Sequence, residues 1–145
     1  MTIDSGAVDT VGPPGMAPGI DLEETDASRN GRYYRAANGT KIAVHGMKRL
    51  RGCTDTGTPI GMEVQIADVK NTLASVARMC EAGNRVVFDP KGSYIEHLDT
   101  GARTEIEKGE DGYRIRMWVP KGDRISPGEE PKEGTCKTEE LGRDQ

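Results

Sequence analysis

The sequence predicts a mostly-β fold that contains one short helix. Its 19 glycines and 8 prolines in 145 residues indicate many turns, a composition that favours short strands over long helices. Several segments alternate apolar and polar side chains with the two-residue period of a strand, whereas one short segment has helical spacing. A chain of this length is expected to form a single domain.

The N-terminal part predicts a very short strand, a long loop and a hairpin. The strand is Thr2-Ile3, and residues 12–31 are rich in glycine, proline and acidic residues, as irregular loops are. Residues 32–37 and 42–50 flank Asn38-Gly39, a dipeptide that tolerates the positive φ angles of a two-residue hairpin turn. We therefore expect these two segments to pair.

The middle of the chain predicts a strand followed by a helix. Residues 62–66 alternate apolar and polar side chains, which is typical of a half-buried strand. Ser75 is a suitable helix cap and Gly83 a suitable helix end. The apolar face expected between them carries Val76, Met79 and Cys80.

Three further strand segments and a tail complete the prediction. Residues 85–89 form an apolar strand, and residues 94–98 and 104–107 form a hairpin around Thr100-Gly101. A last strand alternates over residues 113–119. The domain is thus expected to span residues 1–119, whereas residues 120–145 carry many charges and few apolar side chains and are expected to form a disordered tail.

Composition argues against several classes of protein. The formal net charge of -4 gives no basic surface for nucleic acid. No apolar run approaches the roughly 20 residues of a membrane span, and no secretory signal follows Met1. The three cysteines, Cys53, Cys80 and Cys136, are widely spaced and are expected to be reduced thiols. These features predict a cytoplasmic protein.

The triplet Asp-Ser/Thr-Gly occurs three times, at residues 4–6, 55–57 and 99–101. Most such triplets are turns, since Asp, Thr and Gly all favour turns. In an aspartic protease, however, two aspartates from two such loops lie about 3 Å apart and share one proton, so that one acts as base and the other as acid. The surroundings of each triplet must therefore decide which one is catalytic.

Only Asp4 has the surroundings that such a loop requires. Ile3 precedes it, apolar residues follow within residues 7–11, and the predicted hairpin lies at a suitable distance to act as a flap. Asp55 follows no apolar strand. After Asp99 there are only two predicted strand segments and the charged tail, which leave no room for a flap and a closing strand, so we interpret its triplet as a β-turn.

Several motifs in order resemble the protease segment of copia-like retrotransposon polyproteins, which are retropepsin-type aspartic proteases. These motifs are Asp4-Ser5-Gly6-Ala7-Val8-Asp9-Thr10-Val11, Ala37-Asn38-Gly39-Thr40-Lys41, Leu73-Ala74-Ser75-Val76 and Val86-Val87-Phe88. The resemblance covers residues 2–119. It implies a retropepsin-like closed β-barrel, the acid protease fold, with one short helix.

The resemblance also implies an activity and its residues. The chain would be an aspartic endopeptidase that hydrolyses a retroelement polyprotein as a homodimer, without a cofactor or metal. Asp4 would be the catalytic acid of each chain, supported by Ser5, Gly6 and Ala7. Asp9 would line a substrate subsite, and the flap would consist of Ala37, Asn38, Gly39 and Thr40.

Three features depart from the family pattern. Retroviral proteases carry an acid at the position of Val8 and an arginine at the position of Ser75, and these two residues pair. Ala74 stands where the family has a glycine. Only three residues precede Asp4, so the N-terminal strand is expected to be truncated.

Two other functions remain open from the sequence. One is a catalytically inactive retropepsin-fold remnant that dimerises or binds peptide. The other is a small β-domain that mediates assembly, in which Asp4 is only a turn residue. A metal enzyme is not indicated, because His45 and His97 lie far apart in the sequence and have no cysteine at ligand spacing.

Overall fold

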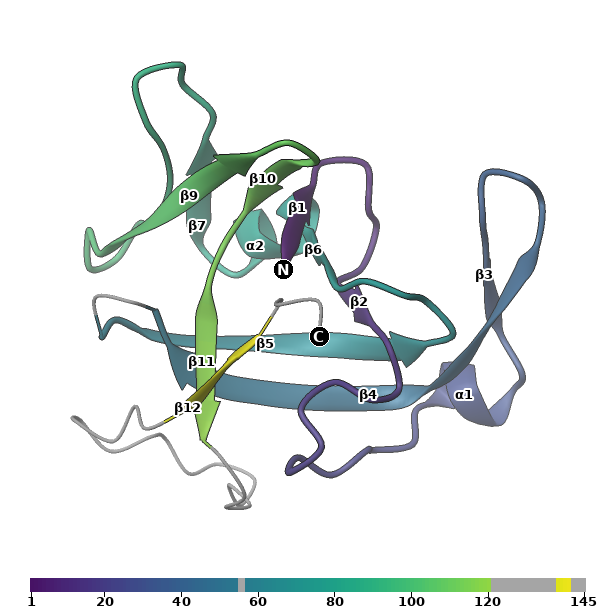
Figure 1. Cartoon of the computed structure of the whole chain (residues 1–145). Helices are drawn as coiled ribbons and strands as arrows, with labels where there is room; N and C mark the ends of the chain where they lie inside the picture. Colours follow the sequence, from purple (N-terminus) through teal and green to yellow (C-terminus); the bar gives the residue numbers. More distant parts are fainter. Residues whose placement is uncertain (55–56, 121–137, 142–145) are drawn as a thin grey trace.

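The computed structural model describes residues 1–54, 57–120 and 138–141 of the chain. This part is mostly β, as predicted, but it has two short helices where one was predicted, since residues 26–29 of the predicted loop form a helical turn (Figure 1). Along the chain the elements are β1 (Thr2–Asp4), β2 (Val11–Gly12), α1 (Asp26–Arg29), β3 (Tyr33–Arg35), β4 (Lys41–Cys53), β5 (Pro59–Ala67), β6 (Leu73–Ser75), α2 (Val76–Glu81), β7 (Asn84–Val87), β8 (Ser93–His97), β9 (Arg103–Gly109), β10 (Gly112–Arg114), β11 (Met117–Pro120) and β12 (Thr138–Leu141). Neither helix of the described part is long and apolar enough to cross a membrane.

The strands form one open sheet, so the closed barrel predicted above is wrong. Their order is β12-β11-β4-β5-β2-β6-β1-β10-β9-β8-β7, and β3 pairs with β4 outside this path. Closure of a barrel requires the two end strands to pair. Here β7 pairs with β8 and contacts α2, and β12 pairs with β11, so the two ends of the sheet stay apart.

Three short strands at the centre of the sheet, β1, β6 and β2, position the loop that connects β1 to β2. β1 runs parallel to β6, with Ile3 opposite Ala74 and Asp4 opposite Ser75. β2 lies on the other side of β6 and pairs with it antiparallel through Val11 and Leu73. The loop between β1 and β2 must therefore pass over the end of β6 at which α2 begins (Figure 1).

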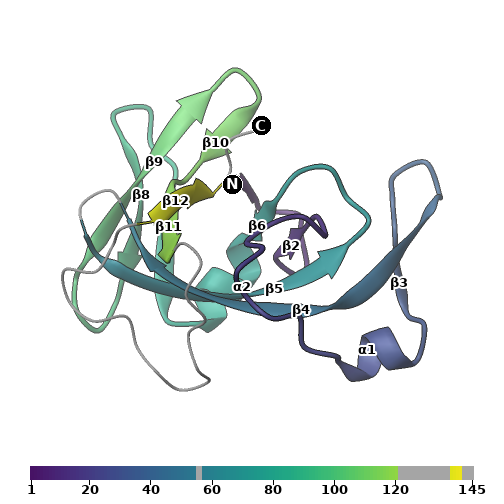
Figure 2. The ribbon, with the colours of Figure 1, turned by 60° about the horizontal axis from the view of Figure 1, so that its bottom comes forward.

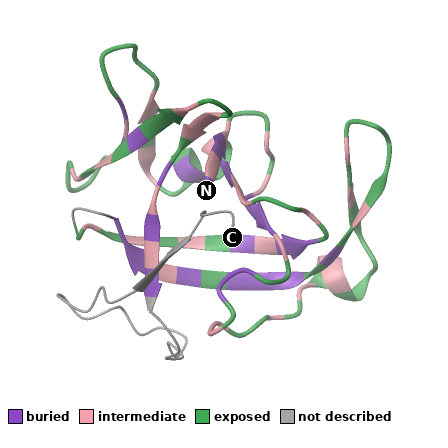
Figure 3. Cartoon of the chain, viewed as in Figure 1, coloured by how far each residue is buried: buried purple, intermediate pink, exposed green. Residues whose placement is uncertain are grey.

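The core lies under the long strands β4 and β5. Leu50, Val64 and Ile66 are almost completely buried, which confirms the alternation predicted for residues 62–66. Ile115, between β10 and β11, and Met117 of β11 join the same cluster. In Figure 3 the buried residues run through the middle of the molecule. The β3–β4 hairpin and the turn between β7 and β8 are mostly exposed.

The hairpin of β3 and β4 projects from one end of the sheet in both ribbon views (Figures 1 and 2). Its pairing confirms the predicted hairpin, with Tyr34 opposite Ile42 and Arg35 opposite Lys41. The turn, however, is longer than two residues. Ala36 N donates to Thr40 O (2.9 Å), Gly39 N donates to Ala36 O (2.9 Å), and Gly39 has a φ of 84°. A type I turn followed by a left-handed glycine produces this geometry.

The helix predicted after Ser75 is present, but the prediction of its apolar face is wrong at one residue, Cys80. Ser75 caps it by accepting from Arg78 N, and Gly83 (φ 88°) follows its end. Met79 is buried as expected, but Cys80 is exposed and free. A six-residue helix buries only a narrow stripe of its surface, and Cys80 lies outside that stripe.

A second cysteine also differs from expectation. Cys53 is disulfide-bonded, so the prediction of reduced thiols is wrong at this position.

Two predicted features lie mainly outside the described residues: the triplet that begins at residue 55 and most of the C-terminal tail. The described residues 138–141 of that tail form β12, which pairs antiparallel with β11.

The last predicted strand is divided into β10 and β11. Tyr113 and Arg114 pair with β9, whereas Trp118 pairs with Cys53 of β4. Between them, Ile115 N donates to Met1 O (3.0 Å), so the chain changes partner at this point. The hairpin predicted around Thr100-Gly101 is confirmed by the pairing of β8 and β9.

Candidate active-site loop

Asp4 lies at the C-terminal end of β1, where the chain turns sharply into the loop. Gly6 N donates a hydrogen bond of 2.8 Å to Asp4 Oδ1, so the side chain closes its own turn. Asp4 is partly exposed, and Ser5 and Gly6 are exposed. The carboxylate is thereby oriented by the loop backbone while it stays accessible.

Ser75 fixes the loop from below. It is completely buried, and Ser75 Oγ donates 2.7 Å to the carbonyl of Ala7. Its backbone N donates 3.0 Å to Thr10 Oγ1, which is also buried. The same Oγ accepts from Arg78 N (3.2 Å), so one hydroxyl joins the loop to the first turn of α2.

Asp9 joins the loop to both α2 and the projecting hairpin. Its Oδ1 accepts from Arg78 Nε (2.9 Å) and Nη2 (2.6 Å), and its Oδ2 accepts from Tyr34 OH (2.8 Å). Arg78 Nη1 also donates to Glu81 (2.9 Å). The resemblance implies a subsite role for Asp9, whereas the geometry engages both of its oxygens within the protein.

Burial and this network shift the pKa of two groups. The pKa of Tyr34 is raised well above its usual range, mainly because burial disfavours the phenolate, and secondly because the hydroxyl donates to Asp9. Hydrogen bonding to Asp9 is the main cause that raises the pKa of Arg78. Tyr34 therefore remains a neutral donor, and Arg78 a cation, across the physiological range.

Asp9 and Arg78 form an ion pair close in sequence to Val8 and Ser75, the two positions compared above with the paired residues of retroviral proteases. Asp9 follows Val8 directly, and Arg78 lies about one helical turn beyond Ser75. Because both members of this ion pair lie at other positions, Val8 and Ser75 gave no indication of it in the sequence.

The predicted flap tip, Ala37 to Thr40, is exposed and has no described hydrogen bond to the loop. Asn38 Oδ1 accepts from Thr40 N (3.0 Å), which stabilises the tip internally. The hairpin reaches the loop through Tyr34 instead. The alternation of side chains along residues 32–37 places Tyr34 on the opposite strand face from Tyr33 and Arg35. No local sequence pattern, however, identifies Asp9 as its hydrogen-bond partner.

The triplet at residues 99–101 does not join this site. Gly101 has a φ of 73° and its N donates to His97 O (2.7 Å), so residues 99–101 form the turn between β8 and β9, as predicted. The triplet at residues 55–57 lies largely outside the described residues. Among the described residues, one loop therefore has the Asp-Gly geometry that holds a carboxylate outward.

Neither histidine belongs to a metal centre within residues 1–54, 57–120 and 138–141, because no cluster of three or more His, Cys, Asp or Glu side chains occurs there. His45 Nε2 lies 2.6 Å from Asp68 Oδ1 on the exposed surface. His97 Nδ1 lies 3.1 Å from Thr100 Oγ1. Both histidines have protein partners.

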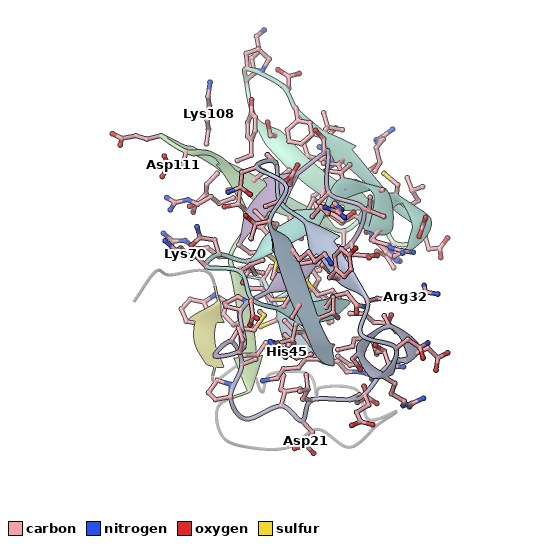
Figure 4. All side chains as sticks on the ribbon, turned by 90° about the vertical axis from the view of Figure 1, so that its right-hand side faces the viewer. Asp21, Arg32, His45, Lys70, Lys108 and Asp111 are labelled. Atoms are coloured by element: carbon pink, nitrogen blue, oxygen red, sulfur yellow. The ribbon has the colours of Figure 1, made fainter. Side chains whose placement is uncertain are left out.

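A shallow cavity of about 300 Å³ lies elsewhere, between the β7–β8 turn and the strands β9 and β10. Phe88 and Tyr113, whose ring centroids are 4.8 Å apart, form part of its lining. Lys108 stands at its edge and projects outward (Figure 4). None of the residues of the Asp4 loop lines this cavity, so it takes no part in the loop's chemistry.

No protein-family model matches the chain, and no significant similarity to a curated protein or to a solved structure is found. Any functional assignment therefore rests on the geometry of the Asp4 loop and its neighbours.

Proposed function

We propose that the chain is a retropepsin-type aspartic endopeptidase that acts as a homodimer on a retroelement polyprotein. One observation carries the proposal: Asp4 leaves the end of β1 in a turn closed by Gly6 N, on a loop that crosses over β6 and is held by Ser75. This arrangement presents a carboxylate outward on a rigid backbone, as a shared-proton aspartate pair requires.

The chemistry follows from two such loops meeting. The Asp4 carboxylates of two chains would share one proton; the ionised one would take a proton from a water molecule, and the protonated one would donate to the substrate carbonyl oxygen. Water then adds to the carbonyl carbon, and the C–N bond of the resulting tetrahedral intermediate breaks as the amine is protonated. No cofactor is needed for this balance.

The surface of the loop supports the meeting of two copies. Val8 follows the triplet and is 73% exposed, which leaves an apolar side chain in water on the same loop as Asp4. A two-fold axis through the loop would place Asp4 opposite Asp4 and would cover both Val8 side chains. The projecting hairpin, tied to the same loop at Asp9, would then act as the flap over a bound polypeptide.

A non-catalytic dimerisation or peptide-binding module is the second candidate. The observation that favours it is the buried methyl of Ala74, opposite Ile3, at the position where the family has a glycine. This methyl adds volume beside β1, the strand that ends at Asp4, and would hold the two Asp4 loops too far apart for proton sharing.

Proteolysis tests the two candidates directly. Purified chain is incubated with casein and with a peptide library between about pH 4 and 6, with and without pepstatin, because a shared carboxylate pair needs one proton. Cleavage that pepstatin and Asp4→Asn both abolish supports the protease. A stable dimer that binds peptides but never cleaves them would instead support the non-catalytic module.

A further inference from the structure

The hairpin of β3 and β4 is joined to the Asp4 loop by a single side chain. Among the described hydrogen bonds and ion pairs, only Tyr34 OH to Asp9 Oδ2, at 2.8 Å, connects residues 33–43 with residues 4–12. The hairpin tip is exposed on all of residues 37–40. Arg32, at the base of the hairpin, projects away from the body (Figure 4).

The two faces of β3 differ, and only one of them turns toward the loop. Tyr33 and Arg35 lie on the outer face, where Arg35 and Lys41 stack on the Tyr33 ring at 5.4 and 4.6 Å. Tyr34, between them, points the opposite way because strand side chains alternate. It is partly buried, whereas Tyr33 and Arg35 are exposed. Tyr34 is thus the one residue of β3 that can contact the loop.

The acceptor on the loop, Asp9, is held by Arg78 of α2. Asp9 Oδ1 accepts two charge-assisted hydrogen bonds from Arg78, at 2.9 and 2.6 Å. Arg78 belongs to the first turn of α2, whose cap, Ser75, also holds the Ala7 carbonyl. Asp9 Oδ2 is therefore held by the same elements that position Asp4.

We propose that Tyr34 is a positioning residue that latches the β3–β4 hairpin onto the Asp4 loop through Asp9. The closed hairpin keeps this hydrogen bond, and an outward swing of the hairpin breaks it. The consequence for substrate binding rests on the proposed function, because there the same hairpin covers the polypeptide. The latch itself is a property of the unliganded chain and requires no catalysis.

A distance measurement tests the latch. Cys80 is exposed and free on α2, and Asn38→Cys adds a thiol at the exposed tip. Spin labels at these two sites are read by double electron–electron resonance, without reductant, after dilution into excess unlabelled protein so that only pairs within one chain contribute. A parent without Asn38→Cys gives the background.

Tyr34→Phe, which removes only the hydroxyl, should add a longer-distance population and raise the ratio of open to closed hairpin roughly tenfold, as expected for loss of a hydrogen bond to a charged group. Tyr33→Phe, its neighbour on the outer face, is the matched control and should keep the parent distribution. If Tyr34→Phe is folded by circular dichroism and also keeps the parent distribution, the latch is refuted.

Proteolysis separates this outcome from the proposed function. If the chain cleaves peptides, Tyr34→Phe should raise KM several-fold more than it lowers kcat, since it weakens the closed hairpin and leaves Asp4 in place. A distance shift without proteolysis would sustain the latch and remove the protease. Proteolysis by Tyr34→Phe with an unchanged distance distribution and an unchanged KM would support the protease and refute the latch.

Discussion

The buried hydroxyl of Ser75 donates to the carbonyl of Ala7 at 2.7 Å, so a residue of β6 holds the loop that begins at Asp4. The same oxygen caps α2 through Arg78 N. One side chain therefore fixes the relative positions of the loop and the helix. The helix cap could be predicted from the sequence, whereas the hydrogen bond to Ala7 becomes apparent only in the folded structure.

Ser75→Ala should destabilise the domain by about 1–3 kcal/mol, because it removes a helix cap and leaves a carbonyl without its partner. The measurement is the free energy of unfolding from urea titration. Ser5→Ala, an exposed change in the same loop, should stay within about 0.5 kcal/mol of wild type. Equal values for the two variants would contradict the role of Ser75.

Asp4→Asn should reduce peptide cleavage by at least about a hundredfold, because the amide cannot share a proton. The fold should survive, since the Asn Oδ1 can still accept from Gly6 N. Initial rates on a cleaved peptide and a thermal melt measure both quantities. Asp99→Asn, in the β8–β9 turn, is the control and should keep full activity; the opposite pattern would move the catalytic role to Asp99.

Activity should rise with protein concentration until the dimer saturates, because each chain offers one such loop in its described part. Val8→Asp should raise the concentration at half-maximal specific activity at least about tenfold, since two buried like charges would meet at the axis. Leu98→Asp, at an exposed apolar residue in the distant β8–β9 turn, is the control. Sedimentation velocity provides the independent measure, and a fully active monomer would exclude a shared site.

Sequence reasoning succeeded where local patterns decide structure. The alternation of residues 62–66, the Ser75 cap and the turn at Gly101 all depend on neighbours in sequence, and all are present. The exposed position of Cys80 was missed because spacing gives the width of an apolar face only approximately in so short a helix.

Contacts between distant segments could not be predicted in this way. The open sheet depends on how β7 and β12 lie relative to each other, and no local pattern encodes that relationship. The Asp9 network joins residues 25 and 69 positions apart. Charge complementarity made such pairs possible, but only the crossing of the loop over β6 brings them together.

Gly52 offers a test of the packing between β4 and β11. A Cβ at this position would collide with the backbone carbonyl of Trp118, whereas a Cβ at Gly61 of β5 would meet only Leu50 O at an ordinary 3.6 Å. Gly52→Ala should therefore destabilise the domain by about 3 kcal/mol or more, because backbone cannot rotate away as a side chain can. Gly61→Ala is the matched control and should change the unfolding free energy by less than about 1 kcal/mol. Similar losses at both positions would show that β4 and β11 are not packed so closely.

The raised pKa of Tyr34 predicts a specific loss of stability in alkali. Unfolded tyrosine ionises near pH 10, whereas burial and the hydrogen bond to Asp9 keep Tyr34 protonated in the folded state beyond that pH. Above about pH 10 the folded state thus holds a proton that the unfolded state has lost, so the unfolding free energy falls as the pH rises. Below that pH the contribution of Tyr34 is fully retained.

Urea titrations of wild type and Tyr34→Phe between about pH 7 and 11 measure this contribution. Tyr34→Phe should be less stable by about 1 kcal/mol at neutral pH, and the difference should shrink above about pH 10. Burial lowers the pKa of Lys48, so Lys48 makes the unfolding free energy rise with pH in alkali, opposite to the effect of Tyr34. This contribution is the same in wild type and Tyr34→Phe and cancels in their difference. Tyr33→Phe should follow wild type, because the Tyr33 hydroxyl meets Arg35 rather than a carboxylate. A constant difference between wild type and Tyr34→Phe across the whole range would mean that Tyr34 ionises alike in both states and that its contact with Asp9 is not maintained in solution.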